Sequence, residues 1–266
     1  MNLCFFSLSL SLLMTAACQR SAPSPSDPPP AQPTNSASPV APAEPWASRP
    51  PREWPQLVLT NHAEFHGHTA LQGASAFLVR TQDGRTLAAT AKHLLGQNGG
   101  VDPEVSVVAL DGAIRSWRLF PRTLEDQFVE AGKVAAPGLD DPKLDWLLLT
   151  LKDTGKPLPA TPLRLRPRPV EVGEDIYLVG CPYIEEPCKQ NVYAGKVTAR
   201  NGHRFRYDVD PPVDLRGFSG APAIDRAGHV VGVIMLWFQP RKQDEKFLEA
   251  GGEDAASVYP RVEPRR

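Results

Sequence analysis

Gly217-Phe218-Ser219-Gly220-Ala221-Pro222 is the stretch from which the fold and the chemistry of this 266-residue chain can be worked out. A serine between two glycines, in a loop that leads into an apolar run, suits a nucleophile whose hydroxyl projects from a sharp turn. Gly217 can take a backbone conformation that is closed to other residues, so neighbouring N–H groups can point at one oxyanion. We therefore predict Ser219 as a nucleophile and the N–H groups of Gly217 and Ser219 as an oxyanion hole.

A serine hydroxyl is a weak nucleophile unless a base takes its proton and a third group orients that base. His93 lies just past the apolar run 86–90, and Asp145 stands directly before the apolar run 146–149. Each of the three residues also has a purely structural interpretation, as a turn serine, a polar cap or a strand end. Taken together, in this order and in these surroundings, they favour catalysis by His93, Asp145 and Ser219.

Several segments in a fixed order make the chain resemble the chymotrypsin-like serine peptidases, and more narrowly their bacterial HtrA-like branch. The matching segments are residues 73–79, 90–95, 145–149, 217–222 and 228–232. The order His, Asp, Ser is that of this family and differs from the order in the α/β-hydrolases. The resemblance spans about residues 58–237, and past it we expect no room for an appended PDZ domain.

The resemblance implies an all-β fold of two antiparallel six-stranded β-barrels with a short C-terminal helix, and a catalytic site in the cleft between the barrels. It also implies a protein or peptide substrate and no cofactor. In this family, residues before the serine loop and on the strand after it line the pocket for the substrate side chain. Here those residues are Val213, Ile234, Met235 and Leu236. They are apolar and predict a small or medium apolar side chain in the substrate. The nearby Asp214 could instead favour Lys or Arg.

Short apolar runs at regular spacing, separated by turn signals, are typical of closed antiparallel barrels. Asp83-Gly84 and Asp111-Gly112 each stand between two apolar runs and predict hairpin turns. The segment 243–250, which Gly251-Gly252 ends, predicts a helix. The predicted strands are 56–60, 74–80, 86–90, 104–110, 113–120, 144–151, 174–180, 191–198, 204–209 and 229–237.

The first residues have the features of an export signal, predicted for 1–17. Residues 3–17 carry no charge and are rich in leucine and serine, and this length is short for a membrane span. The segment ends in Thr15-Ala16-Ala17-Cys18, which resembles the lipobox of bacterial lipoproteins and predicts lipidation of Cys18. An ordinary signal peptide cleaved near Ala17, with Cys18 incidental, is the alternative.

A linker is predicted for residues 18–53, because 11 of the 31 residues from 21 to 51 are proline and most of the others are alanine or serine. Such a composition cannot bury a core and favours an extended spacer. The peptidase domain is predicted for 54–266, with barrel one at about 54–153, barrel two at about 165–240 and a tail at 241–266.

The lipobox resemblance also predicts where the protein resides. Gln19 follows Cys18, which under the rule for bacterial lipoproteins implies an outer-membrane lipoprotein that faces the periplasm. Without lipidation, the protein would be periplasmic or secreted. The membrane would then be a partner only through the lipid on Cys18.

Two cysteines remain once Cys4 is assigned to the signal core and Cys18 to lipidation. Cys181 and Cys188 lie seven positions apart in an exported domain, which favours a local disulfide. On a strand, four side chains of the types that bind zinc would share one face: His62, Glu64, His66 and His68. We interpret them as a polar strand edge or loop rather than a metal site. The net charge of −1 gives no reason to expect a nucleic-acid partner.

The predicted function is therefore a serine endopeptidase of the bacterial cell envelope, a hydrolase that works through an acyl-enzyme. A catalytically inactive, peptide-binding lipoprotein on the same fold is the main alternative. An α/β-hydrolase esterase is disfavoured, because the only histidine after Ser219 is His229, which stands in a predicted strand.

Overall fold

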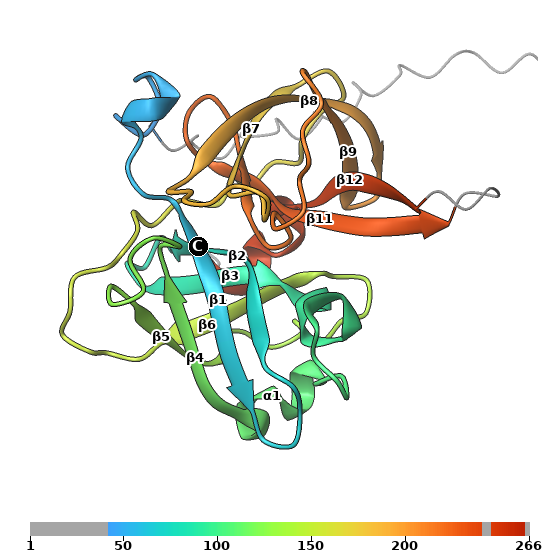
Figure 1. Ribbon diagram of the computed structural model, residues 1–266. Coiled ribbons are helices and arrows are strands. Elements are labelled where there is room, and N and C mark those ends of the chain that lie inside the picture. Colours follow the sequence, from blue (N-terminus) through green and yellow to red (C-terminus); the bar gives the residue numbers. More distant parts are fainter. Residues whose placement is uncertain (1–41, 241–245, 264–266) are drawn as a thin grey trace, which may run out of the picture. The chain divides into compact units, whose positions relative to one another are not determined.

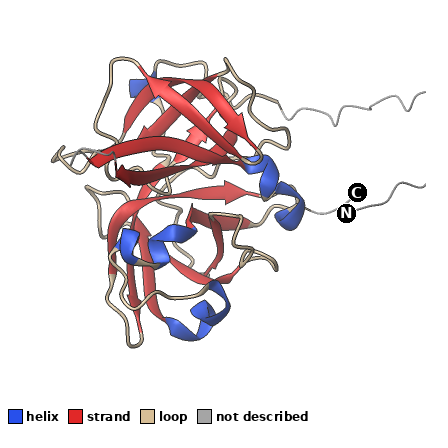
Figure 2. Ribbon diagram, turned by 90° about the vertical axis from the view of Figure 1, so that its right-hand side faces the viewer, coloured by secondary structure: helices blue, strands red, loops and turns tan. Residues whose placement is uncertain are grey.

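Two closed six-stranded antiparallel β-barrels make up the part of the chain that the computed structural model describes, residues 42–240 and 246–263 (Figures 1 and 2). Barrel one closes in the order β1-β2-β3-β6-β5-β4, and barrel two in the order β10-β11-β12-β9-β8-β7. The predicted all-β double barrel is thereby confirmed. The predicted signal, Cys18 and most of the predicted linker lie outside the described residues.

The strands of barrel one are β1 (Val58–Phe65), β2 (Leu71–Arg80), β3 (Thr86–Ala91), β4 (Ile114–Phe120), β5 (Val129–Val134) and β6 (Trp146–Leu151). Those of barrel two are β7 (Asp175–Gly180), β8 (Asn191–Asn201), β9 (Arg204–Val209), β10 (Pro222–Ile224), β11 (Val230–Pro240) and β12 (Lys246–Asp254). The described helices are short: α1 (Val107–Ala113), α2 (Tyr259–Val262) and the 3-10 turns η1 (Pro51–Glu53), η2 (Lys92–Leu95), η3 (Gln97–Gly99) and η4 (Ala255–Ser257). None of the described helices is long and apolar enough to cross a membrane.

The strand predicted at 104–110 is wrong, because that segment runs into the helix α1. Ser106 caps the helix: its side chain accepts a hydrogen bond from the N–H of Ala109 at 3.3 Å. This cap favours a helical turn over the extended backbone that the apolar residues alone would adopt. Asp111 and Gly112 consequently lie inside α1 rather than in a hairpin turn.

The helix predicted at 243–250 is also wrong. Residues 241–245 lie outside the described part, and from Lys246 onward the chain is the strand β12. β12 pairs with β11 from Pro240↔Lys246 to Gly232↔Asp254, and its last residues also pair with β9. This pairing with distant strands closes barrel two and overrides the local helical pattern. The short C-terminal helix is confirmed, but as α2.

The two barrels are filled by inward-facing apolar side chains. β1 and β9 alternate between buried and more exposed residues, as a strand with one face toward a core must. The largest fully buried side chains are Trp117, Trp146, Phe77, Phe205 and Phe218. Trp146 also joins the barrels, because its indole N–H donates to the backbone oxygen of Asp254 at 3.2 Å.

The connection between the barrels is bonded to both of them. Leu163 forms a parallel bridge with Val79 of β2, and Leu165 forms one with Val230 of β11. The two bridging residues lie only two positions apart, so the connector extends a sheet of each barrel. It thereby fixes how barrel two is attached to barrel one.

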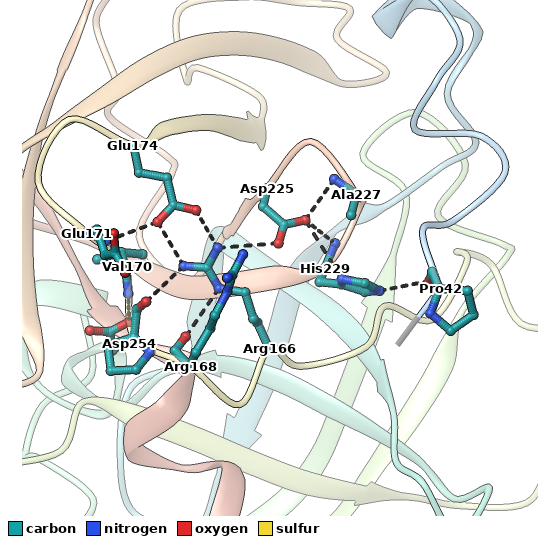
Figure 3. Close-up of polar contacts among 11 residues, drawn as sticks. Pro42, Arg166, Arg168, Val170, Glu171, Glu174, Asp225, Ala227, His229 and Asp254 are labelled. Atoms are coloured by element: carbon teal, nitrogen blue, oxygen red, sulfur yellow. Dashed lines mark hydrogen bonds and ion pairs between the residues drawn. The ribbon is translucent and has the colours of Figure 1, made fainter. Parts of the chain in front are cut away.

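Arg166 in this connector is the centre of a buried ion network in barrel two (Figure 3). Its side chain is only 4% exposed and pairs with Glu174 through both carboxylate oxygens and with Asp225 at 3.4 Å. The same guanidinium donates to the backbone oxygens of Arg168 and Pro169, both at 3.2 Å. The positive charge is therefore fully compensated, as a buried charge must be.

Replacing Arg166 by alanine is expected to lower the free energy of unfolding by about 3 kcal/mol or more, because Glu174 and Asp225 would keep their charges without the buried partner. Urea unfolding followed by circular dichroism measures the change. Arg168→Ala is the control: its side chain is exposed, and a loss within about 0.5 kcal/mol is expected. Equal losses in the two variants would contradict the role given to Arg166.

Candidate active site

Strand register brings His93 and Asp145 together. Ala91, the last residue of β3, pairs with Trp146, the first residue of β6, so the residues just beyond these ends meet. The N–H of Lys92 donates to the backbone oxygen of Asp145 at 2.6 Å and extends the ladder by one bond. The chain then turns into η2, which directs the ring of His93 back over the Asp145 carboxyl.

The Asp145 carboxylate holds His93 at two points. One oxygen accepts the backbone N–H of His93 at 2.7 Å, and the other lies 2.6 Å from ring atom Nδ1. An ionised carboxylate only accepts hydrogen bonds, so Nδ1 must carry the proton. In the neutral ring, Nε2 is then left with its lone pair, as a general base requires. Nε2 is buried and has no hydrogen-bond partner among the described residues.

Ser219 reaches the same place from barrel two. It is half-buried and lines a pocket of about 280 Å³ together with His93. The pocket is also lined by Gly217, Leu71, Leu94, Tyr183, Arg216 and Leu236. The structure thus bonds His93 to Asp145 and sets Ser219 and His93 in one pocket, without a hydrogen bond between these two residues. Unliganded sites often show such loose spacing.

Ser75 of β2 holds the serine loop against barrel one. Its backbone N–H donates to the oxygen of Ser219 at 2.8 Å, and its hydroxyl donates to the oxygen of Gly217 at 2.8 Å. The backbone oxygen of Ser75 is fixed in turn by the side chains of Asn61 at 2.9 Å and Thr90 at 2.7 Å. This buried polar cluster positions the loop that carries the predicted nucleophile.

The glycines of the loop are required by its geometry. Gly217 has φ +104°, and a Cβ there would lie 2.7 Å from the backbone oxygen of Cys181. Gly220 has φ +84°, and a Cβ there would collide with the Ser75 oxygen and the Thr90 hydroxyl. The N–H groups of Gly217 and Ser219, the predicted oxyanion donors, donate to no acceptor in the described part of the chain.

Cys181 and Cys188 form a disulfide, with an S–S distance of 2.07 Å, so the predicted pairing is present. It closes a loop that carries Tyr183 over the serine loop. The Tyr183 hydroxyl accepts the N–H of Ala74 at 2.7 Å, and its ring would contact a Cβ added at Gly217 at 3.1 Å. Tyr183 therefore adds a second tie between the barrels beside the serine loop.

The residues predicted to line the substrate pocket lie in different surroundings. Ile234 is fully buried in the core, and Val213 is half-buried against it. Met235 and Leu236 line a separate pocket of about 550 Å³ with His93 and Asp145, and Leu236 also reaches the pocket of Ser219. Asp214 is bound by Arg216, whose hydrogen bond lowers the pKa of that carboxyl. The substrate preference stays a prediction.

Phe218 stands inside the serine loop and serves the core. Its side chain is fully buried and its ring lies 5.8 Å from that of Tyr193. Gly180 makes room for it, because a Cβ there would lie 2.5 Å from the Phe218 ring. The loop is therefore anchored to barrel two by an aromatic side chain and to barrel one by Ser75.

Three residues that support the site were missed by sequence reasoning: Ser75, Tyr183 and Glu253. Glu253 is a buried carboxylate of β12 that accepts the backbone N–H of Asp145. Each acts through a partner more than 100 residues away, so local patterns carry no signal for it. Among the described residues, no group of three or more histidine, cysteine or acidic side chains could hold a metal ion. His68 instead uses Nδ1 to contact the backbone oxygen of Pro103 at 2.6 Å.

Comparison with known proteins gives one family match. The family described as trypsin-like peptidase domain matches residues 74–233. No curated protein sequence gives a significant match. Among solved structures, the chain is similar to kallikrein-related peptidase 10 in complex with Zn²⁺, with a TM-score of 0.51, 14% identity, and coverage of 81% of this chain and 94% of that one.

Two further solved structures align with the chain at lower TM-scores. The active form of the Rv3671c protease from M. tuberculosis gives 0.49 with 18% identity, covering 78% of this chain and 79% of that one. Deg5 gives 0.48 with 18% identity, covering 77% and 86%. The kallikrein similarity agrees with the double barrel described above.

Gly217→Ala is expected to lower the free energy of unfolding by roughly 2 kcal/mol more than Gly84→Ala does. Both glycines have positive φ, but Gly84 lies in an open turn with nothing within 4 Å of an added Cβ, whereas Gly217 faces the Cys181 oxygen. Urea unfolding of the two variants measures the difference. Matching losses would mean that the loop can move away from Cys181 at little cost.

Proposed function

Because the chain belongs to the family of the trypsin-like peptidase domain, which its residues 74–233 match, we propose that it is a serine endopeptidase acting through Ser219, His93 and Asp145. The observation that carries the proposal is the state of His93. Its Nδ1 is bonded to a buried carboxylate at 2.6 Å, its Nε2 is buried without a hydrogen-bond partner, and His93 lines the same pocket as Ser219. A histidine that only stabilised the fold would have both ring nitrogens satisfied.

In the proposed reaction, Nε2 of His93 takes the proton of the Ser219 hydroxyl as Oγ bonds to the carbonyl carbon of the peptide. The N–H groups of Gly217 and Ser219 stabilise the negative oxygen of the tetrahedral intermediate, at roughly 3 kcal/mol per donor. The C–N bond then breaks, and His93 returns the proton to the leaving amine. Water repeats the sequence on the acyl-enzyme, which releases the acid and restores Ser219.

Asp145 keeps its charge throughout this cycle. It holds the ring of His93 in the tautomer whose Nε2 is free, and it stabilises the imidazolium that forms when the proton moves. Its burial strengthens both effects, because the field of a charge is screened less away from water. The backbone bond from the N–H of His93 to the same carboxylate fixes the position of the histidine as a whole.

Labelling with a fluorophosphonate probe tests the proposal. We expect the purified protein to be modified at Ser219, and His93→Ala to slow both the labelling and peptide hydrolysis by at least about 10⁴-fold, because the base would be gone. Intact-mass spectrometry locates the adduct. His203→Ala, which changes an exposed histidine outside the site, is the matched control and should label at the normal rate.

If folded protein remained unlabelled at Ser219, the chain would be a non-catalytic member of the fold that binds peptides in the same pocket. Circular dichroism of each variant separates this outcome from unfolding. Labelling that survived His93→Ala would assign activation of the serine to another group and would contradict the triad.

We further propose that the domain is held in the cell envelope by a lipid on Cys18. The support is the apolar, uncharged stretch at 3–17, the small residues before Cys18 and the proline-rich spacer that follows. An extended spacer would hold the domain away from the membrane surface, since polyproline-like chain advances about 3 Å per residue. Substrates would then be peptides or proteins of the same compartment.

Cys18→Ser is expected to abolish incorporation of labelled palmitate into the expressed protein and to move it from the membrane fraction to the soluble fraction, because the thioether attachment point is lost. Cys4→Ser is the control, since Cys4 lies in the segment that would be removed. Fluorography and fractionation report the result. Palmitate incorporation by Cys18→Ser would identify another lipid site, and absence of palmitate from the wild type would favour the ordinary signal peptide.

A further inference from the structure

Glu253 lies at the junction of the two barrels and plays no part in the reaction as described above. It is the second-last residue of β12, is fully buried and belongs to barrel two. One of its oxygens accepts the backbone N–H of Asp145 at 2.5 Å, although Asp145 belongs to barrel one and lies 108 positions away. A residue of the second barrel thus contacts the acidic member of the predicted triad.

The second carboxylate oxygen of Glu253 is also occupied. It accepts the hydroxyl of Ser257 in η4 at 2.9 Å, and that hydroxyl also lies 2.6 Å from the backbone oxygen of Asp254. Three charged groups act on Glu253: the carboxylate of Asp145 opposes its charge, whereas Arg204 and Lys92 favour it. Because its neighbours within bonding distance are donors, the site is built for an acceptor.

The bond to Asp145 acts on the segment that orients His93. The Asp145 backbone is held at its oxygen by the N–H of Lys92 and at its N–H by Glu253, directly before β6 begins. With both backbone groups held, the Cα of Asp145 is fixed at a place from which both carboxylate oxygens reach His93. Loss of Glu253 would leave a buried N–H without an acceptor and free this segment to shift.

We propose that Glu253 is a positioning residue, an acceptor that barrel two supplies to hold the backbone of Asp145 and, through it, the Asp145–His93 pair. The inference rests on the proposed function, since it concerns the same site. Glu253 touches neither Ser219 nor the pocket that Ser219 lines. It therefore acts only through Asp145.

The position has a consequence for pH dependence. Burial raises the pKa of Glu253 to about 7. Above that pH, the carboxylate accepts both hydrogen bonds; below it, one oxygen carries a proton and can donate to the Ser257 hydroxyl, while the other still accepts the N–H of Asp145. The hold on Asp145 is therefore expected to persist as the pH falls through the pKa, because it needs an acceptor oxygen and not the charge.

Two substitutions separate the hydrogen bond from the charge. Glu253→Gln keeps an oxygen for the N–H of Asp145, while its amide N–H₂ can donate to Ser257, whose hydroxyl turns to Asp254. Glu253→Ala removes both acceptors. The control is Asp254→Asn, a change of the adjacent buried carboxyl, whose side chain contacts Val170 and Arg200 but no member of the triad.

Two readouts are measured on the full chain: the fluorophosphonate labelling rate, and the downfield proton NMR signal of the Nδ1–H that His93 donates to Asp145. At pH 8 we expect Glu253→Ala to label between about ten- and a hundredfold more slowly, with a weakened or absent downfield signal. Glu253→Gln should keep the signal and most of the rate. Asp254→Asn should match the wild type in both.

The pH profile adds a test that does not depend on Glu253→Ala folding. Between pH 8 and pH 6, the labelling rate of Glu253→Gln relative to the wild type should stay constant, because the protonated acid, like the amide, keeps an oxygen for the N–H of Asp145. A ratio that changed about tenfold over this range would overturn the inference, because the charge and not the acceptor oxygen would then hold Asp145; a wild-type rate and signal in folded Glu253→Ala would also overturn it. Suppose that the wild type failed to label but showed the downfield signal, and that Glu253→Ala lacked this signal. The proposed function would then fail, and the positioning role of Glu253 would stand.

Discussion

The hydrogen bonds of Ser75 are the constraint on which the site depends. This residue of barrel one donates its N–H to the oxygen of Ser219 and its hydroxyl to the oxygen of Gly217, so the serine loop of barrel two rests on a strand of the other barrel. The bonds are buried, and the side chains of Asn61 and Thr90 hold the backbone oxygen of Ser75, which accounts for the burial of these two polar residues. Such a network is rigid only when every member is satisfied, and here the indole of Trp117 completes it by donating to Asn61.

The barrels are joined at a few polar points rather than by apolar packing alone. Tyr183 accepts a backbone N–H of barrel one, Glu253 accepts another, and Trp146 of barrel one donates to a backbone oxygen of barrel two. Each of these bonds satisfies a group that would otherwise be buried without a partner. Hydrogen bonds depend on direction more strongly than apolar contacts do. They can therefore set one angle between the two barrels, where apolar contacts alone would allow several angles. The connector, which bridges to both sheets within three residues, removes the remaining freedom.

How much could be predicted from the sequence follows from the range of each signal. The serine loop, the histidine after β3 and the aspartate before β6 are marked by neighbouring residues, so their elements can be placed from the sequence alone. β12 could not, because Lys246–Asp254 becomes a strand through pairing with β11 and β9, and its own residues favour a helix. The cap on α1 is a single serine in a run that otherwise reads as a strand. Ser75 and Glu253 are ordinary residues whose importance comes only from what the fold brings beside them.

The distances along the chain between bonded residues govern when the pocket can exist at all. The bond from Ser75 to Gly217 joins residues that lie 142 positions apart in the sequence, and the bond between Asp145 and Glu253 joins residues 108 positions apart. Closing long stretches costs entropy before any contact rewards it, so we expect these contacts to form after the local strand pairs. A ribosome must also have finished β12 before Asp145 has its support from Glu253 and before barrel two can close. Unfinished copies of the polypeptide therefore pass through synthesis without the assembled pocket, which exists only once both barrels have closed.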